Sequence, residues 1–281
     1  MTFADDHFTM LISGKAAFAA AALVTLWVLE SVWPMFIGRR ERTRHAAANL
    51  ALGVFNAVIV SLLFGAAILL VTEWARQRPF GLLHWLDAPA WLAWPLGLLL
   101  FDAWMYTWHV LNHHVPFLWR FHAVHHADRQ LDVTSAVRFH TIEIMLSATA
   151  RLMVLPFIGL TLPMLLAYEL ILLPVIMFHH SNIRIPPRVD SILRWLIVTP
   201  RMHWVHHSCE RHETNSNFAS VLSIWDRLFR TFRLRSDPEA IVLGLDDQRD
   251  ESDVGSWRSL RGMLARPFRQ QPPRDRRPEG D

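Results

Sequence analysis

The stretch Leu118–His126 reads LWRFHAVHH and places three histidines, His122, His125 and His126, at positions i, i+3 and i+4. On an α-helix these spacings bring the side chains to one face, so the stretch predicts a helix that presents three imidazole rings together. The adjacent rings of His125 and His126 diverge by about a hundred degrees around the helix axis and can therefore serve two different metal ions. Because imidazole is the commonest side-chain metal ligand, the stretch predicts a metal site.

Two further histidine clusters bracket this stretch. His109 and His113 form HVLNH upstream, and His203, His206 and His207 form HWVHH downstream. The HxxxH spacing places two rings one helical turn apart, where both can reach one ion. The three clusters supply eight imidazoles, which are too many for one ion and suitable for two. A ligand set of this kind suits iron, zinc, copper or nickel, and ligand type alone does not decide between them.

The composition is that of a membrane protein. Hydrophobic residues make up 52% of the 281 positions and fall in long blocks rather than in amphipathic stripes. Cys209 is the single cysteine, so the chain can build neither a disulfide framework nor a thiolate metal site of its own.

The apolar blocks predict an all-α integral membrane helical bundle of three spans plus a helical hairpin, with a cytoplasmic histidine-rich helical cap. The spans are Ala16–Gly38, about Ala46–Val71 and Ala90–Met105, and the hairpin is Ile142–Phe178 with a turn near its centre. The basic run Arg39–His45 follows the first span and places that end in the cytoplasm. We therefore expect a multi-pass protein, of a bacterial inner membrane, whose histidine clusters face the cytoplasm.

Four ordered segments carry a resemblance to a known family. The segments are DAWMYTWHVLNHHVPFLWRFHAVHHADRQLDVTSAVRFHTIE (Asp102–Glu143), FHHSNIRIP (Phe178–Pro186), TPRMHWVHHS (Thr199–Ser208) and NFASVLSIWDRLFRTF (Asn217–Phe232). Together they closely resemble the fatty acid hydroxylase and sterol desaturase superfamily. The resemblance covers roughly residues 95–232 and implies a catalytic domain there. The apolar runs before it predict an N-terminal transmembrane region over 1–94, and the composition after it predicts a partly disordered cytoplasmic C-terminal tail over 233–281.

The resemblance also implies a function. Members of this superfamily are membrane-bound di-iron enzymes that use O₂ to hydroxylate or desaturate lipids such as sterols, fatty acyl chains or ether lipids. Two iron ions are the implied cofactors, with zinc as a possible substitute in purified protein. Carried over by motif, the implied metal ligands are His109, His113, His122, His125, His126, His203, His206 and His207, with His140 (RFH) and His180 (HSN) at further histidine positions of the pattern.

The sequence departs from the family pattern at flanking positions. Val110 follows His109 where the family often has arginine, and Arg230 stands where glycine is common. Neither change removes a ligand, so both concern substrate fit more than metal binding. His114 and His179 are extra histidines beside motif positions and are left out of the ligand set.

Oriented imidazoles need hydrogen-bond acceptors, and electrons for O₂ chemistry need a source. Candidate acceptors are Asp102, Asp128, Asp132, Glu143, Asn182, Asn217 and Asp226.

The sequence contains no GxGxxG, no cysteine-rich iron–sulfur pattern and no haem domain, so we expect a separate electron-donor or reductase protein as partner. The other expected partners are the lipid substrate and the bilayer. The arginine- and proline-rich stretch Arg266–Asp281 is expected to be a disordered, lipid-attracted tail rather than a nucleic-acid arm.

Two other function classes compete with the lipid oxygenase. A membrane zinc hydrolase would need HExxH, but Val110, Ala123 and Trp204 follow the first histidine of each cluster. A non-catalytic haem-binding carrier or metal transporter would place histidines inside the spans, and the first two predicted spans contain none. Isolated histidines such as His45 and His84 are assigned no role.

Overall fold

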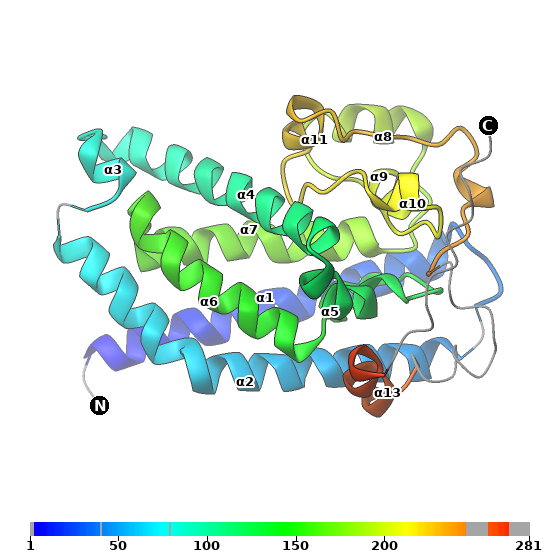
Figure 1. Ribbon diagram of the computed structural model, residues 1–281, viewed down its shortest axis with the longest axis horizontal. Coiled ribbons are helices and arrows are strands. Elements are labelled where there is room, and N and C mark those ends of the chain that lie inside the picture. Colours follow the sequence, from blue (N-terminus) through cyan, green and yellow to red (C-terminus); the bar gives the residue numbers. More distant parts are fainter. Residues whose placement is uncertain (1–2, 40, 79, 246–257, 270–281) are drawn as a thin grey trace.

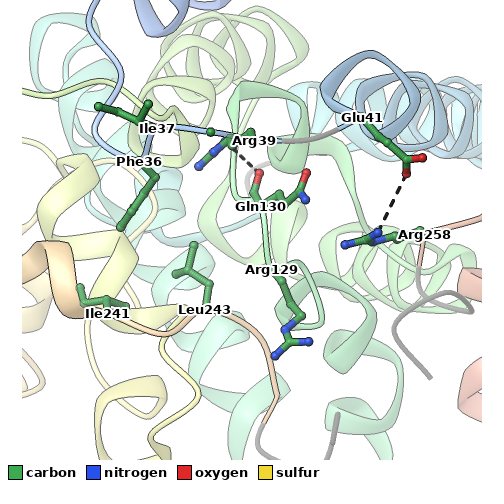
Figure 2. A pocket seen from close by; sticks show the side chains of 10 residues that line it. Phe36, Ile37, Arg39, Glu41, Arg129, Gln130, Ile241, Leu243 and Arg258 are labelled. Atoms are coloured by element: carbon green, nitrogen blue, oxygen red, sulfur yellow. Dashed lines mark hydrogen bonds and ion pairs between the residues drawn. The ribbon is translucent and has the colours of Figure 1, made fainter. Parts of the chain in front are cut away.

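The computed structural model describes residues 3–39, 41–78, 80–245 and 258–269, and over these ranges the chain is helical, with three isolated β-bridges and no strand. The predicted all-α class is confirmed. Five long helices lie side by side along the longest axis (Figure 1), and they are α1 (Phe3–Val32), α2 (Arg42–Gln77), α4 (Ala90–His114), α6 (Thr141–Ile158) and α7 (Leu162–His180).

The short elements divide between the two ends of this bundle (Figure 1). At one end lies α3 (Leu82–Trp85). Toward the other lie α5 (Pro116–His126), η1 (Val133–Val137), α8 (Pro187–Leu193), α9 (Pro200–His206), α10 (Arg211–Thr214), α11 (Ile224–Leu228), η2 (Pro238–Ala240), α13 (Leu260–Ala265) and η3 (Arg266–Phe268). All predicted histidine clusters therefore lie toward this second end.

Four helices are long and apolar enough to cross a bilayer, judged by length and composition. The candidate segments are Gly14–Val32, Arg42–Trp85 (which takes in α2 and α3), Thr141–Ile158 and Leu162–His180. The helix at the predicted third span, α4, is not among them. Its first turns hold two tryptophans and Pro95, and its middle holds Asp102, all of which lower its mean hydropathy.

The predicted hairpin is formed by two helices, α6 and α7. A left-handed residue, Gly159 at φ 84°, ends α6 and lets the chain reverse within three residues. Pro163 stands in the first turn of α7, where its missing N–H costs no helix bond. The chain thus returns to the end of the bundle at which α6 began (Figure 1).

A buried carboxylate on α4 fixes the short helices to the bundle. Asp102 accepts hydrogen bonds from the hydroxyl of Tyr168 on α7 (2.7 Å), the indole of Trp225 on α11 (2.8 Å) and the backbone N–H of Leu222 (3.1 Å). The ring of Tyr168 in turn meets Phe101 edge to face at 4.9 Å. The α11 segment is therefore held beside the middle of α4.

The predicted disordered tail is wrong at its beginning. Arg266–Phe268 form η3, whose Phe268 ring lies 6.0 Å from Phe121 and 5.9 Å from His140, centroid to centroid. Arg120 donates a hydrogen bond to the carbonyl of Pro267. These apolar and polar contacts order a segment that its composition alone made look disordered. Residues 270–281 lie outside the described residues.

The close approach of two backbones at the α3 end gives a stability prediction. Gly81 has φ 100°, and a Cβ there would lie 2.4 Å from the carbonyl oxygen of Pro156 and 2.7 Å from Gly159. We expect Gly81→Ala to lower the free energy of unfolding by roughly 2 kcal/mol, through strain and overpacking. Thermal unfolding in detergent measures this loss. Gly65→Ala, where a Cβ meets nothing within 4 Å, is the control, and an equal loss in both variants would contradict the prediction.

Candidate metal centre

Nine of the ten predicted histidines come together in two groups. Within each group, one ring nitrogen of every histidine lies within 4.8 Å of the corresponding nitrogens of the other members. The five-histidine group consists of His109, His113, His122, His126 and His206, and the four-histidine group consists of His125, His180, His203 and His207. The groups adjoin, because the rings of His126 and His207 stack at 4.4 Å across them.

The two HxxHH motifs each contribute to both groups. On α5 the rings of His125 and His126 stand at 87° to each other, and at the end of α9 those of His206 and His207 stand at 83°. The helical divergence of adjacent residues therefore directs one ring of each pair into each group. The ends of α4 and α7 supply the remaining rings.

In the four-histidine group, lone pairs face one another. Nδ1 of His125 lies 3.2 Å from the carbonyl oxygen of Arg138, and Nδ1 of His180 lies 2.6 Å from that of Ile176. A carbonyl only accepts, so each neutral ring donates from Nδ1 and carries a lone pair on Nε2. These two Nε2 atoms lie 3.1 Å apart.

The same crowding continues to the other two rings. Nε2 of His203 lies 2.9 Å from Nε2 of His180 and 3.1 Å from Nε2 of His207. A hydrogen on one Nε2 atom turns one of these Nε2–Nε2 contacts into a hydrogen bond, whereas a cation at the centre binds the lone pairs of all four rings. Metal–imidazole bonds of about 2.1 Å put nitrogens on one ion at most about 4.2 Å apart. The donor set therefore fits one metal ion.

In the five-histidine group, three rings have their Nδ1 atoms hydrogen-bonded to the surrounding protein. Nδ1 of His109 donates to the carbonyl of Phe218 (2.8 Å), and Nδ1 of His206 to that of Ser216 (2.7 Å). Nδ1 of His122 pairs with Oε1 of Glu143 at 2.7 Å.

The Nε2 atoms of all five rings in this group lack a hydrogen-bond partner among the described residues. Within the described part of the chain no hydrogen-bond partner reaches the buried Nε2 atoms of His109, His113, His122, His126 and His206. Unpaired buried polar atoms cost free energy, typically about 1–3 kcal/mol each. Five of them converging on one point fit a second metal ion.

Burial keeps four of the nine rings in the neutral form that binds metal. Burial lowers the pKa of His126, His203 and His207 well below the usual value, and it lowers the pKa of His206 to about 3. These imidazoles are therefore neutral near pH 7 and keep a lone pair for a cation.

His140 lies apart from both groups. It caps the start of α6, where Nδ1 accepts from the backbone N–H of Ile142 (3.1 Å), and its Nε2 donates to the carbonyl of Leu264 (3.2 Å). Its two ring nitrogens are both used. His179, which the sequence left unassigned, is instead buried and stacks on His203 at 4.0 Å. His114 is exposed.

Of the candidate orienting acceptors, Glu143 contacts a ring of the two groups. Asp226 acts one step away, because its carboxylate accepts from the backbone N–H groups of Phe218 (2.7 Å) and Ala219 (3.2 Å) and so positions the carbonyl that receives His109. Burial raises the pKa of Asp226 to about 6. The backbone carbonyl acceptors were missed, since no side-chain pattern marks them.

His45, to which the sequence assigns no role, is buried. Its Nδ1 lies 2.9 Å from Oδ2 of Asp132 and its Nε2 lies 2.9 Å from Asp128, so it bridges the two carboxylates. Asp132 caps η1 and Asp128 follows α5, while the carbonyl of Arg138 just after η1 receives His125. A histidine on α2 thereby fixes the segment that orients a ring of the four-histidine group.

Comparison with known proteins gives a consistent family. Residues 94–231 match the family described as fatty acid hydroxylase. An ornithine lipid hydroxylase from Rhizobium tropici is 32% identical over 150 residues, covering 53% of this chain and 44% of the relative. Human alkylglycerol monooxygenase is 30% identical (79% and 46%), and rat cholesterol 25-hydroxylase is 28% identical (62% and 62%). The chain thus spans about half the length of the first two, and no solved structure matches it significantly.

Metal stoichiometry tests the division into two groups. We expect the intact protein to bind two ions per chain, and His206→Ala and His207→Ala each to bind one, because each change removes a ligand from a different group. Elemental analysis after metal loading measures this. The exposed His114 gives the control His114→Ala, which should keep two ions. Loss of both ions in each single variant would argue for one shared site.

The His45 bridge gives a stability prediction. We expect His45→Gln to lower the free energy of unfolding by about 3–5 kcal/mol, because it leaves two buried carboxylates without their partner. Thermal unfolding of the metal-free protein isolates this effect from metal binding. The exposed His84 supplies the matched control His84→Gln, and a loss no larger than in the control would refute the bridging role.

Proposed function

The chain belongs to the fatty acid hydroxylase and sterol desaturase superfamily, and on that basis we propose that it is a membrane-bound di-iron oxygenase. It uses O₂ and external electrons to hydroxylate, or desaturate, a lipid. The observation that carries this proposal is the pair of adjoining buried histidine groups with their nitrogens turned inward.

Nine histidines are the proposed iron ligands. Five belong to the first site (His109, His113, His122, His126 and His206) and four to the second (His125, His180, His203 and His207). His140 is left out because both of its nitrogens are hydrogen-bonded elsewhere. Two adjacent iron ions supply O₂ activation strong enough to attack an unactivated C–H bond.

The protein itself holds and orients the imidazole rings and excludes water from the site. Carbonyl oxygens of Phe218 and Ser216 and the carboxylate of Glu143 fix the ring planes and direct Nε2 inward. Burial keeps the imidazoles neutral, as the pKa of His206 near 3 illustrates. It also excludes bulk water from the place at which a reactive oxidant would form.

A membrane lipid is the substrate class that this placement favours. His180 lies at the end of α7, a helix apolar enough to span a bilayer, and the other histidines of both groups gather around it, so an acyl or alkyl chain reaches them without leaving the membrane. The relatives named above act on an ornithine lipid, alkylglycerols and cholesterol, all of which are lipids with an oxidisable hydrocarbon part. Hydroxylation is the better supported reaction, because their names specify hydroxylases and monooxygenases.

The proposed topology puts the histidine groups in the cytoplasm. Arg39 lies between α1 and α2, and Arg42, Arg44 and His45 lie in the first turn of α2, at the bundle end to which the histidine helices also run (Figure 1). On a bacterial inner membrane this side gives access to cytoplasmic reductases, and a separate electron-donor protein completes the reaction. In this topology α4 is the third crossing, and α6 and α7 form the hairpin that returns to the cytoplasmic side.

Isotope transfer tests the oxygenase function. We expect the iron-loaded protein in nanodiscs, given reductant, isotopically heavy O₂ and a lipid extract, to place one heavy oxygen atom in a lipid. Mass spectrometry identifies that lipid. Turnover with zinc in place of iron, or product oxygen taken from water, would overturn the proposal. His125→Ala and His206→Ala should each lower the rate at least about a hundredfold, while His114→Ala should retain it.

A further inference from the structure

An apolar surface outside the candidate spans covers α8, the turn that follows it, and α11. Seven large apolar side chains there are between 46% and 72% exposed, and they are Val189, Ile192, Trp195, Leu196, Ile224, Leu228 and Phe229. Contiguous exposed apolar patches of this kind mark interaction surfaces. We call this surface the α8–α11 face.

The two segments form one rigid unit. The backbone N–H of Ser223 donates to the carbonyl of Leu196 (3.2 Å), and a guanidinium nitrogen of Arg227 donates to the carbonyl of Arg194 (2.7 Å). Ile197 and Leu222 pair in a β-bridge beside them. The seven side chains are therefore presented together.

The α8–α11 face lies beside an apolar part of the bundle. Asp102 in the middle of α4 receives Trp225 and Leu222, which flank the first residue of α11. One turn further along α4, the ring of Tyr106 stacks on Phe229 at 5.2 Å. Since the sequence predicts that α4 crosses the membrane up to about Met105, α11 lies where this crossing meets the surface.

The exposed charge on these two segments is positive. Arg188 and Arg230 are exposed, and Arg194 and Arg227 are half-buried. The guanidinium of Arg227 lies 4.6 Å from the ring centre of Trp195. The acidic residues of the same segments, Asp190 and Asp226, are both buried. Tryptophan and arginine around an apolar surface are typical of proteins that lie in a bilayer interface.

We propose that the α8–α11 face is a membrane-docking surface, embedded in the leaflet at which the histidine groups lie. Its apolar side chains enter the boundary of the acyl chains, and its arginines contact anionic headgroups. The docked face is connected to the histidine groups through α9. Asp190 of α8 accepts a hydrogen bond from the hydroxyl of Thr199 (2.7 Å), the residue before α9. Docking thus holds the helix that carries His203 and His206 against the bilayer.

Depth measurement by site-directed spin labelling tests this proposal without using activity. In a Cys209→Ser background, a nitroxide is attached at Leu196→Cys. Val28→Cys on α1, 52% exposed within a candidate span, is the lipid reference, and Ala240→Cys, exposed on η2, is the water reference. In vesicles containing anionic lipid, the label at position 196 should resemble the lipid reference, being reached by O₂ and shielded from a water-soluble nickel chelate.

Two results would overturn the docking proposal. One is access of the nickel chelate to position 196 equal to that at Ala240→Cys. The other is spin–spin broadening between labels at position 196, which would show that a second copy of the chain covers the face. Neither result depends on metal loading or turnover, so the proposed oxygenase function would stand or fall separately.

The arginines are tested by lipid charge. Arg188→Gln combined with Arg230→Gln should make the label at position 196 shallower in anionic vesicles and leave its depth unchanged in neutral ones. The control is Arg211→Gln, an exposed arginine on α10 outside the face. An equal shift in the control, or the same shift in neutral vesicles, would remove the electrostatic part of the proposal.

Discussion

The structure depends on bringing nine imidazole nitrogens into contact with one another and away from water. Nε2 atoms 2.9–3.1 Å apart in the four-histidine group, and unpaired buried nitrogens in the five-histidine group, are unfavourable until a cation lies between them. Metal binding relieves these unfavourable contacts, so the free energy that they cost in the metal-free protein adds to the affinity for metal. The rest of the molecule can be understood as the means of holding these rings in place while they are unsatisfied.

That holding is distributed over distant parts of the chain. Backbone carbonyls fix several rings, and carbonyls stay fixed because their own segments are anchored, as Asp226 anchors Phe218. On the other side, His45 of α2 bridges Asp128 and Asp132 and so fixes the segment between α5 and α6. The metal ligands occupy short stretches, but their orientation requires contacts between helices far apart in sequence.

This difference explains how much the sequence could predict. Apolar blocks depend on local composition, and ligand spacing depends on helix geometry, so the all-α class and the eight clustered histidines were accessible from the sequence, while His180 was accessible only through its match to the family pattern. His45 was not accessible, because its partners lie 83 and 87 residues away. His140 matched the family motif, yet its ring caps α6 and contacts the C-terminal segment, which no local pattern reveals. The ordering of Phe268 has the same origin, in contacts that the arginine- and proline-rich composition of its segment does not predict.

Asp102 shows why α4 differs from the other long helices. A buried carboxylate is unfavourable unless it is hydrogen-bonded, and Asp102 lowers the mean hydropathy of α4, which is not among the four candidate spans. Its three donors, from α7 and the α11 segment, offset that cost and at the same time hold α11 against the bundle. The polarity that lowers the hydropathy of α4 is thus the polarity that attaches the short helices to it. Because α4 also carries His109 and His113, one helix links the bundle, the histidine groups and the short helices beside them.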